Sequence, residues 1–210
     1  MKTDDLVNIL AQDSSVRWRF GHILGMATAV GIAIAAIGFS EIGFRPDVAV
    51  ALYSPRFLFK FIVTVSLAIV AMGALLRLAR PGVPLGWWRQ VLVLPSVLLL
   101  GGVMVELFSV PEAALAARWI GSNARICLIA IPLLAVGPLV CLLLALKHGA
   151  PQRPGIAGAI AGLAASGIAA TFYAAHCPDD SPLFVATWYS IATAIVVLAG
   201  SIAGSKYLKW

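Results

Sequence analysis

The sequence Tyr173-Ala-Ala-His176-Cys177-Pro178-Asp179-Asp180-Ser181-Pro182 separates two long apolar runs. Its two prolines discourage either flanking helix from continuing through the stretch. It also holds one of the three cysteines, one of the three histidines and two of the nine acidic residues of the chain. We predict a short loop at a membrane surface, which serves either as a hydrophilic turn between two helices or as a thiol or metal site.

The composition of the whole chain is that of an integral membrane protein. Of its 210 residues, 61% are hydrophobic and 11% are charged, and the mean hydropathy is +0.97, far outside the range of soluble domains. A membrane-spanning helix needs about 20 mostly apolar residues. Six runs meet this requirement, at Phe20–Ser40, Leu58–Leu78, Trp88–Ser109, Arg125–Leu146, Gly155–Ala175 and Leu183–Gly204. We therefore predict an all-α fold, in which residues 20–210 form a bundle of six transmembrane helices in the lipid bilayer and residues 1–19 form a separate segment.

The distribution of positive charge predicts the orientation of this bundle, because Lys and Arg in short loops stay on the cytoplasmic side. With both termini inside, the inner set is Lys2, Arg17, Arg19, Arg77, Arg80, Arg89, Lys147, Arg153, Lys206 and Lys209. The outer set is half as large and comprises Arg45, Arg56, Lys60, Arg118 and Arg125. This arrangement explains the net charge of +6, which therefore gives no indication of direct nucleic-acid binding.

The segment before the first span predicts a short amphipathic helix on the cytoplasmic side. Thr3 is suited to cap this helix, and three apolar side chains share one face at helical spacing, with Asp13 at the end of that face. A helix of about ten residues is not stable alone in water, so its apolar edge needs a partner. The partner is either the lipid surface or a cytoplasmic protein, and the acidic residues favour the protein because they would repel anionic headgroups. The predicted partner-binding residues are Asp4, Asp5, Leu6, Ile9, Leu10 and Asp13.

Two features of the spans bear on assembly and on function. The run Gly155–Ala175 carries small residues at every fourth position, including Gly158, Gly162 and Ser166. Such a stripe permits close helix contact, either inside the bundle or between protomers of a homo-oligomer. No Asp, Glu, Lys or Arg lies in the middle third of any predicted span, which weighs against a transporter with an ion or proton pathway.

The three cysteines separate by their depth in the membrane. Cys127 lies in the first turn of the fourth span and Cys177 just past the fifth, so both are expected at the outer surface. Cys141 is 14 residues beyond Cys127, or about 21 Å along a helix, and is therefore expected near the inner surface as a small buried hydrophobe. The outer pair predicts a disulfide or a thiolate–metal site, in which His176 or Asp179 would be further ligands of a transiently bound metal ion.

The chain resembles the NrsF family, negative regulators of sigma F. The resemblance extends over nearly the whole sequence, and the most specific motif runs from His176 to Phe184. The other matching motifs are the opening Met1–Leu10, Arg45-Pro46-Asp47, Ser54–Lys60, Arg80-Pro81-Gly82 and Trp188-Tyr189. Members of this family are bacterial inner-membrane proteins of six spans that restrain an extracytoplasmic-function sigma factor.

This resemblance implies a membrane-bound anti-sigma factor without enzymatic activity or a permanent cofactor. The segment 1–19 would hold the sigma factor, and Cys127 and Cys177 would match the family's cysteines, which are tied to metal or oxidative stress sensing. Cys141 has no counterpart in that pattern. The alternative prediction is a small membrane enzyme or carrier that uses the outer Cys, His and Asp cluster on a thiol or metal substrate.

Overall fold

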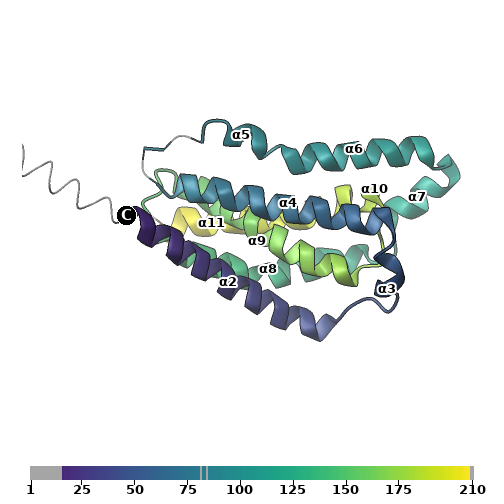
Figure 1. Ribbon diagram of the computed structural model, residues 1–210, viewed down its shortest axis with the longest axis horizontal. Coiled ribbons are helices and arrows are strands. Elements are labelled where there is room, and N and C mark those ends of the chain that lie inside the picture. Colours follow the sequence, from purple (N-terminus) through teal and green to yellow (C-terminus); the bar gives the residue numbers. More distant parts are fainter. Residues whose placement is uncertain (1–15, 81, 84, 209–210) are drawn as a thin grey trace, which may run out of the picture.

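The computed structural model describes residues 16–80, 82–83 and 85–208, and within these ranges the regular structure is entirely helical. The long helices run side by side along one axis (Figure 1). The predicted amphipathic helix within residues 1–13 lies outside the described residues. In chain order the elements are α2 (Val16–Ile42), α3 (Val48–Ala51), α4 (Pro55–Leu78), α5 (Trp88–Val91), α6 (Leu94–Ser109), α7 (Glu112–Ile120), α8 (Ala124–Leu146), α9 (Pro154–His176), α10 (Pro182–Phe184), the π-helical segment η2 (Val185–Tyr189) and α11 (Ser190–Tyr207).

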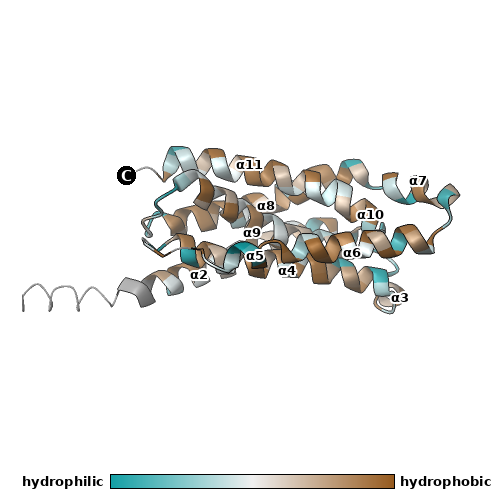
Figure 2. Cartoon of the chain, turned by 90° about the horizontal axis from the view of Figure 1, so that it is seen from above, coloured by the Kyte–Doolittle hydropathy of each residue, from teal (hydrophilic) through white to brown (hydrophobic). Residues whose placement is uncertain are grey.

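Six helical stretches are long and apolar enough to cross a membrane, and they confirm the predicted all-α fold with six spans. Hydrophobic residues cover the lengths of these helices, while hydrophilic residues gather toward the ends and in the connectors (Figure 2). A helix of 23 residues is about 35 Å long, which is enough for the hydrocarbon core of a bilayer. The stretches are Phe20–Ile42, Pro55–Leu78, Trp88–Ser109, Ala124–Leu146, Pro154–His176 and Pro182–Tyr207.

Helix α9 is the centre of the bundle. It packs against α4, α8 and α11, and 61% of the residues in its most apolar window are buried. The α5–α6 stretch is at the opposite extreme with 11% buried, and Figure 1 shows α6 at the edge of the bundle beside α4. The sequence of α9, rich in Gly and Ala, explains its position because small side chains let three helices approach one axis.

The small-residue stripe of α9 makes its closest contact with α11 inside the bundle. A Cβ atom added at Gly162 would lie 2.7 Å from the carbonyl oxygen of Val196, and one added at Gly204 would lie 2.8 Å from the Cα atom of Gly158. Such distances are shorter than van der Waals contact, so the two backbones meet where glycine stands on both helices. The stripe therefore serves packing within one chain.

We expect Gly158→Val to destabilise the bundle, because a side chain at this position would meet the α11 backbone at Gly200 and Gly204. Overpacking of this kind costs about 1–3 kcal/mol. Thermal unfolding of the purified protein in detergent measures the loss. The matched control is Gly101→Val on α6, where an added Cβ has no neighbour within 4 Å. An equal fall in the unfolding midpoint for both variants would contradict the assigned packing.

Three local features were not predicted. The connector after α6 contains the nine-residue helix α7, for which no prediction was made from the sequence. The third span is interrupted between Val91 and Leu94, so Pro95 lies in the first turn of α6. The last span begins with a short turn, α10, and the π-helical segment η2, a type of irregularity that is frequent at functional sites.

Candidate functional site

The loop from His176 to Ser181, here called the 176–181 loop, is where the largest number of segments meet. It lies at the end of the bundle that carries α3 and α7, opposite the end where α2 begins (Figure 1). Side chains or backbone groups from the α2–α3 connector, α4, α6 and the start of α8 all hydrogen-bond to it. The polar stretch that separates α9 from α10 therefore fastens the ends of several spans to one another at this end of the bundle.

The centre of this loop is a buried ion cluster around Asp180. Lys60 of α4 donates to Asp180 Oδ1 at 2.7 Å, and Arg45 donates from Nη1 to Asp180 Oδ2 at 2.8 Å. Lys60 also donates to the carbonyl oxygen of Cys177 at 2.8 Å. The Lys60 side chain is 1% exposed and that of Asp180 16%. The cluster thus fixes both the carboxylate and the backbone of the cysteine.

A second carboxylate balances the charge of this cluster. Asp47 accepts hydrogen bonds from Arg45 Nε at 2.6 Å and Arg45 Nη2 at 2.7 Å. This bidentate pair raises the pKa of the Arg45 guanidinium and lowers the pKa of the Asp47 carboxyl. The two buried cations are therefore matched by two carboxylates, of which Asp180 is mostly buried and Asp47 is mostly exposed. Pairing of this kind compensates the high cost of burying the charges of Lys60 and Arg45.

Asp179 holds the start of α8. Its carboxylate accepts hydrogen bonds from the backbone N–H groups of Ser122 at 3.0 Å and Asn123 at 2.9 Å. These are donors at a helix N-terminus, where negative charge is favourable. Gly121, with φ +59°, permits this approach, because a Cβ there would lie 2.9 Å from Asp179 Cγ. Asp179 therefore joins the 176–181 loop to the helix that carries Cys127.

Glu106 joins the 176–181 loop to the end of α6. This residue is 2% exposed and accepts hydrogen bonds from Ser181 Oγ at 2.6 Å and from the backbone N–H of Leu183 at 3.1 Å. Its other oxygen pairs with Arg118 of α7 at 3.2 Å. Trp119, the next residue of α7, donates to Thr187 Oγ1 at 2.8 Å. The unpredicted helix α7 is therefore anchored to the start of the last span.

Cys177 belongs to this loop, and Cys127 of α8 lies close to it. Both thiols are free and fully buried, and they lie within electrostatic range of each other and of Lys60. The Cys177 thiol lies beside the hydroxyls of Tyr173 and Tyr189. Burial raises the pKa of the Cys177 thiol above its ordinary value, although the Lys60 ammonium acts in the opposite direction. Cys177 is therefore a neutral thiol at pH 7.

The other predicted metal ligands have separate partners. His176 Nδ1 lies 3.0 Å from the carbonyl oxygen of Gly43, and Asp179 binds the start of α8. Over residues 16–80, 82–83 and 85–208, no three His, Cys, Asp or Glu side chains are grouped in a way that suits a metal ion. The metal and disulfide alternatives at Cys127 and Cys177 both stay predictions. Cys141 is half-buried on α8, away from this site, as its position in the sequence predicted.

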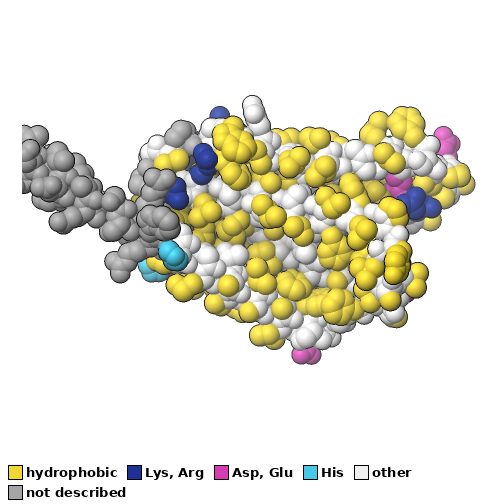
Figure 3. Space-filling view, viewed as in Figure 1, with side chains coloured by type: hydrophobic (Ala, Val, Ile, Leu, Met, Phe, Trp, Pro, Cys, Tyr) yellow, Lys and Arg dark blue, Asp and Glu magenta, His cyan; other side chains and the backbone are white. Residues whose placement is uncertain are grey.

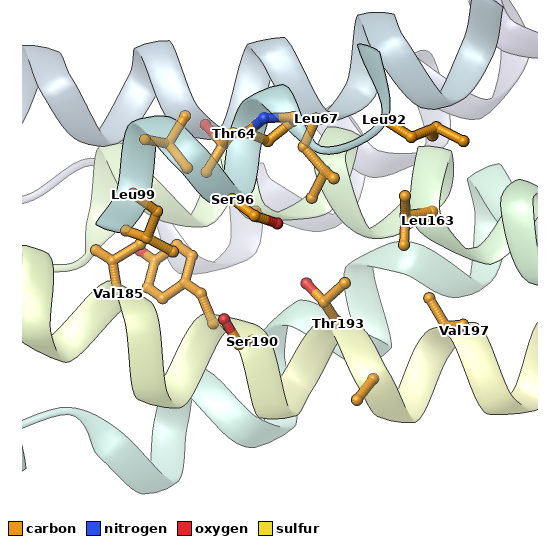
Figure 4. A pocket seen from close by; sticks show the side chains of 15 residues that line it. Thr64, Leu67, Leu92, Ser96, Leu99, Leu163, Val185, Ser190, Thr193 and Val197 are labelled. Carbon is orange, nitrogen blue, oxygen red and sulfur yellow. The ribbon is translucent and has the colours of Figure 1, made fainter. Parts of the chain in front are cut away.

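A cavity of about 400 Å³ opens between α4, α6, α9 and the last span. Figure 4 shows the side chains of Thr64, Ser96, Ser190 and Thr193 around it, among Leu and Val side chains. Tyr189 also lines this cavity, and its hydroxyl is beside the Cys177 thiol. Tyr189 is therefore a neighbour of both the cavity and the buried cysteine.

From the sequence, Lys60 was given only a structural salt link and Asp180 only a place among the acids of the alternative enzyme or carrier site. Glu106 was given no role, yet all three residues are central to the contacts of the loop. The signal for Lys60 and Glu106 was present, because an ionisable residue inside an apolar helix needs a partner. For the adjacent acids the sequence offered no such signal. Asp179 was named as a metal ligand, whereas Asp180 is the one that meets the buried cations.

The chain matches the family model NrsF, "Negative regulator of sigma F", over residues 10–210. It is similar to the anti-sigma-F factor NrsF of Caulobacter vibrioides (strain NA1000 / CB15N), with 32% identity over 221 residues and full coverage of both chains. It is equally similar to the probable anti-sigma-F factor NrsF of Azospira oryzae (strain ATCC BAA-33 / DSM 13638 / PS), with 32% identity over 219 residues and full coverage of both. No solved structure matches the chain. The chain therefore belongs to the NrsF family of negative regulators of sigma F.

Proposed function

We propose that this chain is a membrane-bound anti-sigma factor that holds an extracytoplasmic-function sigma factor and releases it when the outer cysteine site changes state. Family membership supports a negative regulator of a sigma factor, and the names of its relatives imply a regulatory, non-enzymatic role. The observation that supports the cysteine site most strongly is the 176–181 loop, which joins Cys177 to the outer ends of the spans.

The proposed location is the bacterial inner membrane, with both termini in the cytoplasm. Ten of the fifteen Lys and Arg residues then lie inside, as the positive-inside rule requires. The start of α2 and the end of α11 lie at the same end of the bundle (Figure 1), as an even number of crossings demands. In this orientation the cysteine site faces the periplasm and the segment 1–19 faces the sigma factor.

The segment 1–19 is the proposed sigma-binding part. Its first thirteen residues combine three apolar residues at helical spacing with three acids, which suits a helix that folds on a basic protein groove. The start of α2 is connected to the rest of the inner end, since Phe20 packs against Gly149 in the α8–α9 connector. A movement of α8 or α9 therefore reaches the base of the sigma-binding segment.

Leu6→Ala with Leu10→Ala is expected to release the sigma factor. Coupled folding and binding loses part of its interaction energy to ordering, so the affinity depends steeply on the apolar anchors. Removing two buried Leu side chains should weaken binding by at least a hundredfold. Co-purification of the sigma factor encoded beside this protein, together with transcription from a sigma-dependent promoter, measures the loss.

The control for this experiment is membrane insertion. Reporter fusions at Gly149 and Asp180 should report the inside and the outside, respectively, in the wild type and in the double variant. Undiminished sequestration by a correctly inserted double variant would refute the anchor assignment. Two fusions on the same side would refute the proposed topology.

Release is proposed to start from a covalent or metal-linked change at Cys127 and Cys177. Fastening these residues would pull the first turn of α8 toward the end of α9, and Pro132 and Pro138 inside α8 are candidate hinges. Shifting a two-state equilibrium from mostly holding to mostly releasing takes about 5.5 kcal/mol. A structural thiolate–metal site supplies more than this amount.

An enzyme or carrier function draws no support from the cavity between α4, α6, α9 and the last span. Its lining contains hydroxyl groups and apolar side chains, but no Cys, His, Asp or Glu. Of the Cys, His and Asp groups named for that alternative, His176 and Asp179 are engaged in hydrogen bonds that position the loop. These contacts therefore favour the regulatory function over an enzyme or carrier function.

A further inference from the structure

A second cavity lies at the opposite end of the bundle from the 176–181 loop. It has a volume of about 490 Å³ and is bounded by the α4–α5 connector, α5 and the start of α9. Three arginines line it: Arg80 after α4, Arg89 in α5 and Arg153 immediately before α9. Among the described residues that line it, none is acidic.

The positive charge of this cavity is uncompensated within the described part of the chain. The ion pairs between described residues all involve Arg45, Lys60 or Arg118 at the other end. The Nε atom of Arg80 is buried and has no hydrogen-bond partner. Figure 3 shows Lys and Arg side chains at both ends of the bundle, whereas the visible Asp and Glu side chains lie away from the end where α2 begins. Three guanidinium groups around one space repel each other, and a bound anion would relieve that repulsion.

The chemistry of the lining favours a phosphate group. Arginine presents paired N–H donors that match phosphate oxygens, and its charge persists at every physiological pH. The cavity also adjoins the N-terminus of the 23-residue helix α9, whose free N–H groups and dipole favour negative charge. Both features select an oxyanion over a neutral ligand.

The position and the apolar wall favour a lipid over a soluble anion. Leu78, Leu85 and Ile156 line the same space, and Ile156 is 41% exposed toward the outside of the bundle. Trp87 and Trp88, beside the cavity in sequence, are residues that sit at headgroup level in membranes. We propose that this cavity binds the phosphate of an anionic phospholipid, whose acyl chains then lie against the apolar wall.

The test uses the purified full-length protein in a neutral detergent, titrated with phosphatidylglycerol or with phosphatidylcholine. We expect phosphatidylglycerol to raise the thermal unfolding midpoint, and phosphatidylcholine to have at most a small effect. In Arg89→Gln with Arg153→Gln, the apparent affinity for phosphatidylglycerol should fall at least tenfold, because each lost charged hydrogen bond has an effect of about that size. The matched control is Lys147→Gln with Lys206→Gln, two exposed residues whose replacement removes equal charge from the same end.

Three outcomes would overturn the proposal. They are an arginine variant that responds to phosphatidylglycerol as the lysine variant does, equal stabilisation by both lipids, and the same midpoint shift with inorganic phosphate alone. If the double arginine variant does not fold, Arg89→Lys keeps the charge but loses the paired donors. Native mass spectrometry of that variant should then show fewer phosphatidylglycerol molecules retained than on the wild type, and equal retention would again contradict the site.

Discussion

Asp180→Ala is expected to destabilise the bundle by about 3–5 kcal/mol, because it leaves two cations without their shared carboxylate. Lys60 is 1% exposed and Arg45 8%, so neither cation regains full hydration in the folded protein. Removing one partner of a buried ion pair costs more than the pair contributed, since the other charge remains buried. The thermal or denaturant-induced unfolding of the protein in detergent micelles measures the change.

Two comparisons separate this prediction from a general loss of surface charge. Glu112→Ala removes an exposed carboxylate at the same end and should change the stability by less than about 0.5 kcal/mol. Lys60→Met combined with Asp180→Asn should be less destabilising than the sum of the two single variants, because the pair is coupled. If Asp180→Ala were as mild as Glu112→Ala, the ion cluster would not hold the loop.

The six spans were predictable because lipid imposes one strong requirement on the backbone. Each crossing segment must satisfy its own hydrogen bonds in hydrocarbon, and only a long apolar helix does so here. The predicted ends differ from the observed ends by at most a few residues, as for Leu183–Gly204 against Pro182–Tyr207. Helix α7 was missed because it lies outside the spans, where hydropathy carries no information about regular structure.

Helix rise alone predicted that Cys141 lies far along α8 from Cys127, but the contacts around Cys127 and Cys177 were not predictable. Lys60 and Asp180 are separated by 120 positions in the chain, and their contact depends on how α4 packs against α9. Asp179 and Asp180 are adjacent and chemically identical, so only the path of the loop decides which one meets α8 and which one meets the cations. The resemblance to the NrsF family pointed to the 176–181 loop, whereas the tertiary structure showed which groups each side chain of the loop contacts.

The glycine stripe of α9 illustrates the same limit. Its spacing predicted close helix contact, but that spacing fits a neighbour in the same chain as well as a second protomer. The structure decides in favour of α11, because the small residues Gly200 and Gly204 lie opposite Gly158. The spacing of small residues in α9 therefore predicts a close helix contact, but it does not predict which helix makes that contact.

Cys127→Ser and Cys177→Ser are each expected to abolish stress-dependent release, whereas Cys141→Ser is expected to leave it intact. Cys127 and Cys177 of the 176–181 loop are buried close to each other, and Cys141 lies 14 residues from Cys127 along α8. Transcription from a sigma-dependent promoter, with and without an oxidant or a thiol-reactive metal, reports release. Induction in the two outer-cysteine variants should fall to the uninduced level.

The raised pKa of Cys177 adds a condition to this switch. A neutral buried thiol reacts slowly, because the thiolate is the nucleophile. Its fraction increases as the pH rises toward that raised pKa, so alkylation of Cys177 in the folded protein should be slow at pH 7 and accelerate at higher pH. The loop must therefore open, or a small reagent must enter, before the signal reaches the thiol.

Opening of the 176–181 loop links the prediction for the ion cluster of Asp180 to the prediction for the cysteine variants. The carbonyl oxygen of Cys177 is held by Lys60 at 2.8 Å, so weakening the ion cluster with Asp180→Asn should expose the thiol and raise its alkylation rate. The same variant should then release the sigma factor at a lower dose of oxidant, provided that both cysteines are present. Wild-type induction in Cys127→Ser and in Cys177→Ser would show that the signal enters elsewhere, and the 176–181 loop would then be a structural fastening alone.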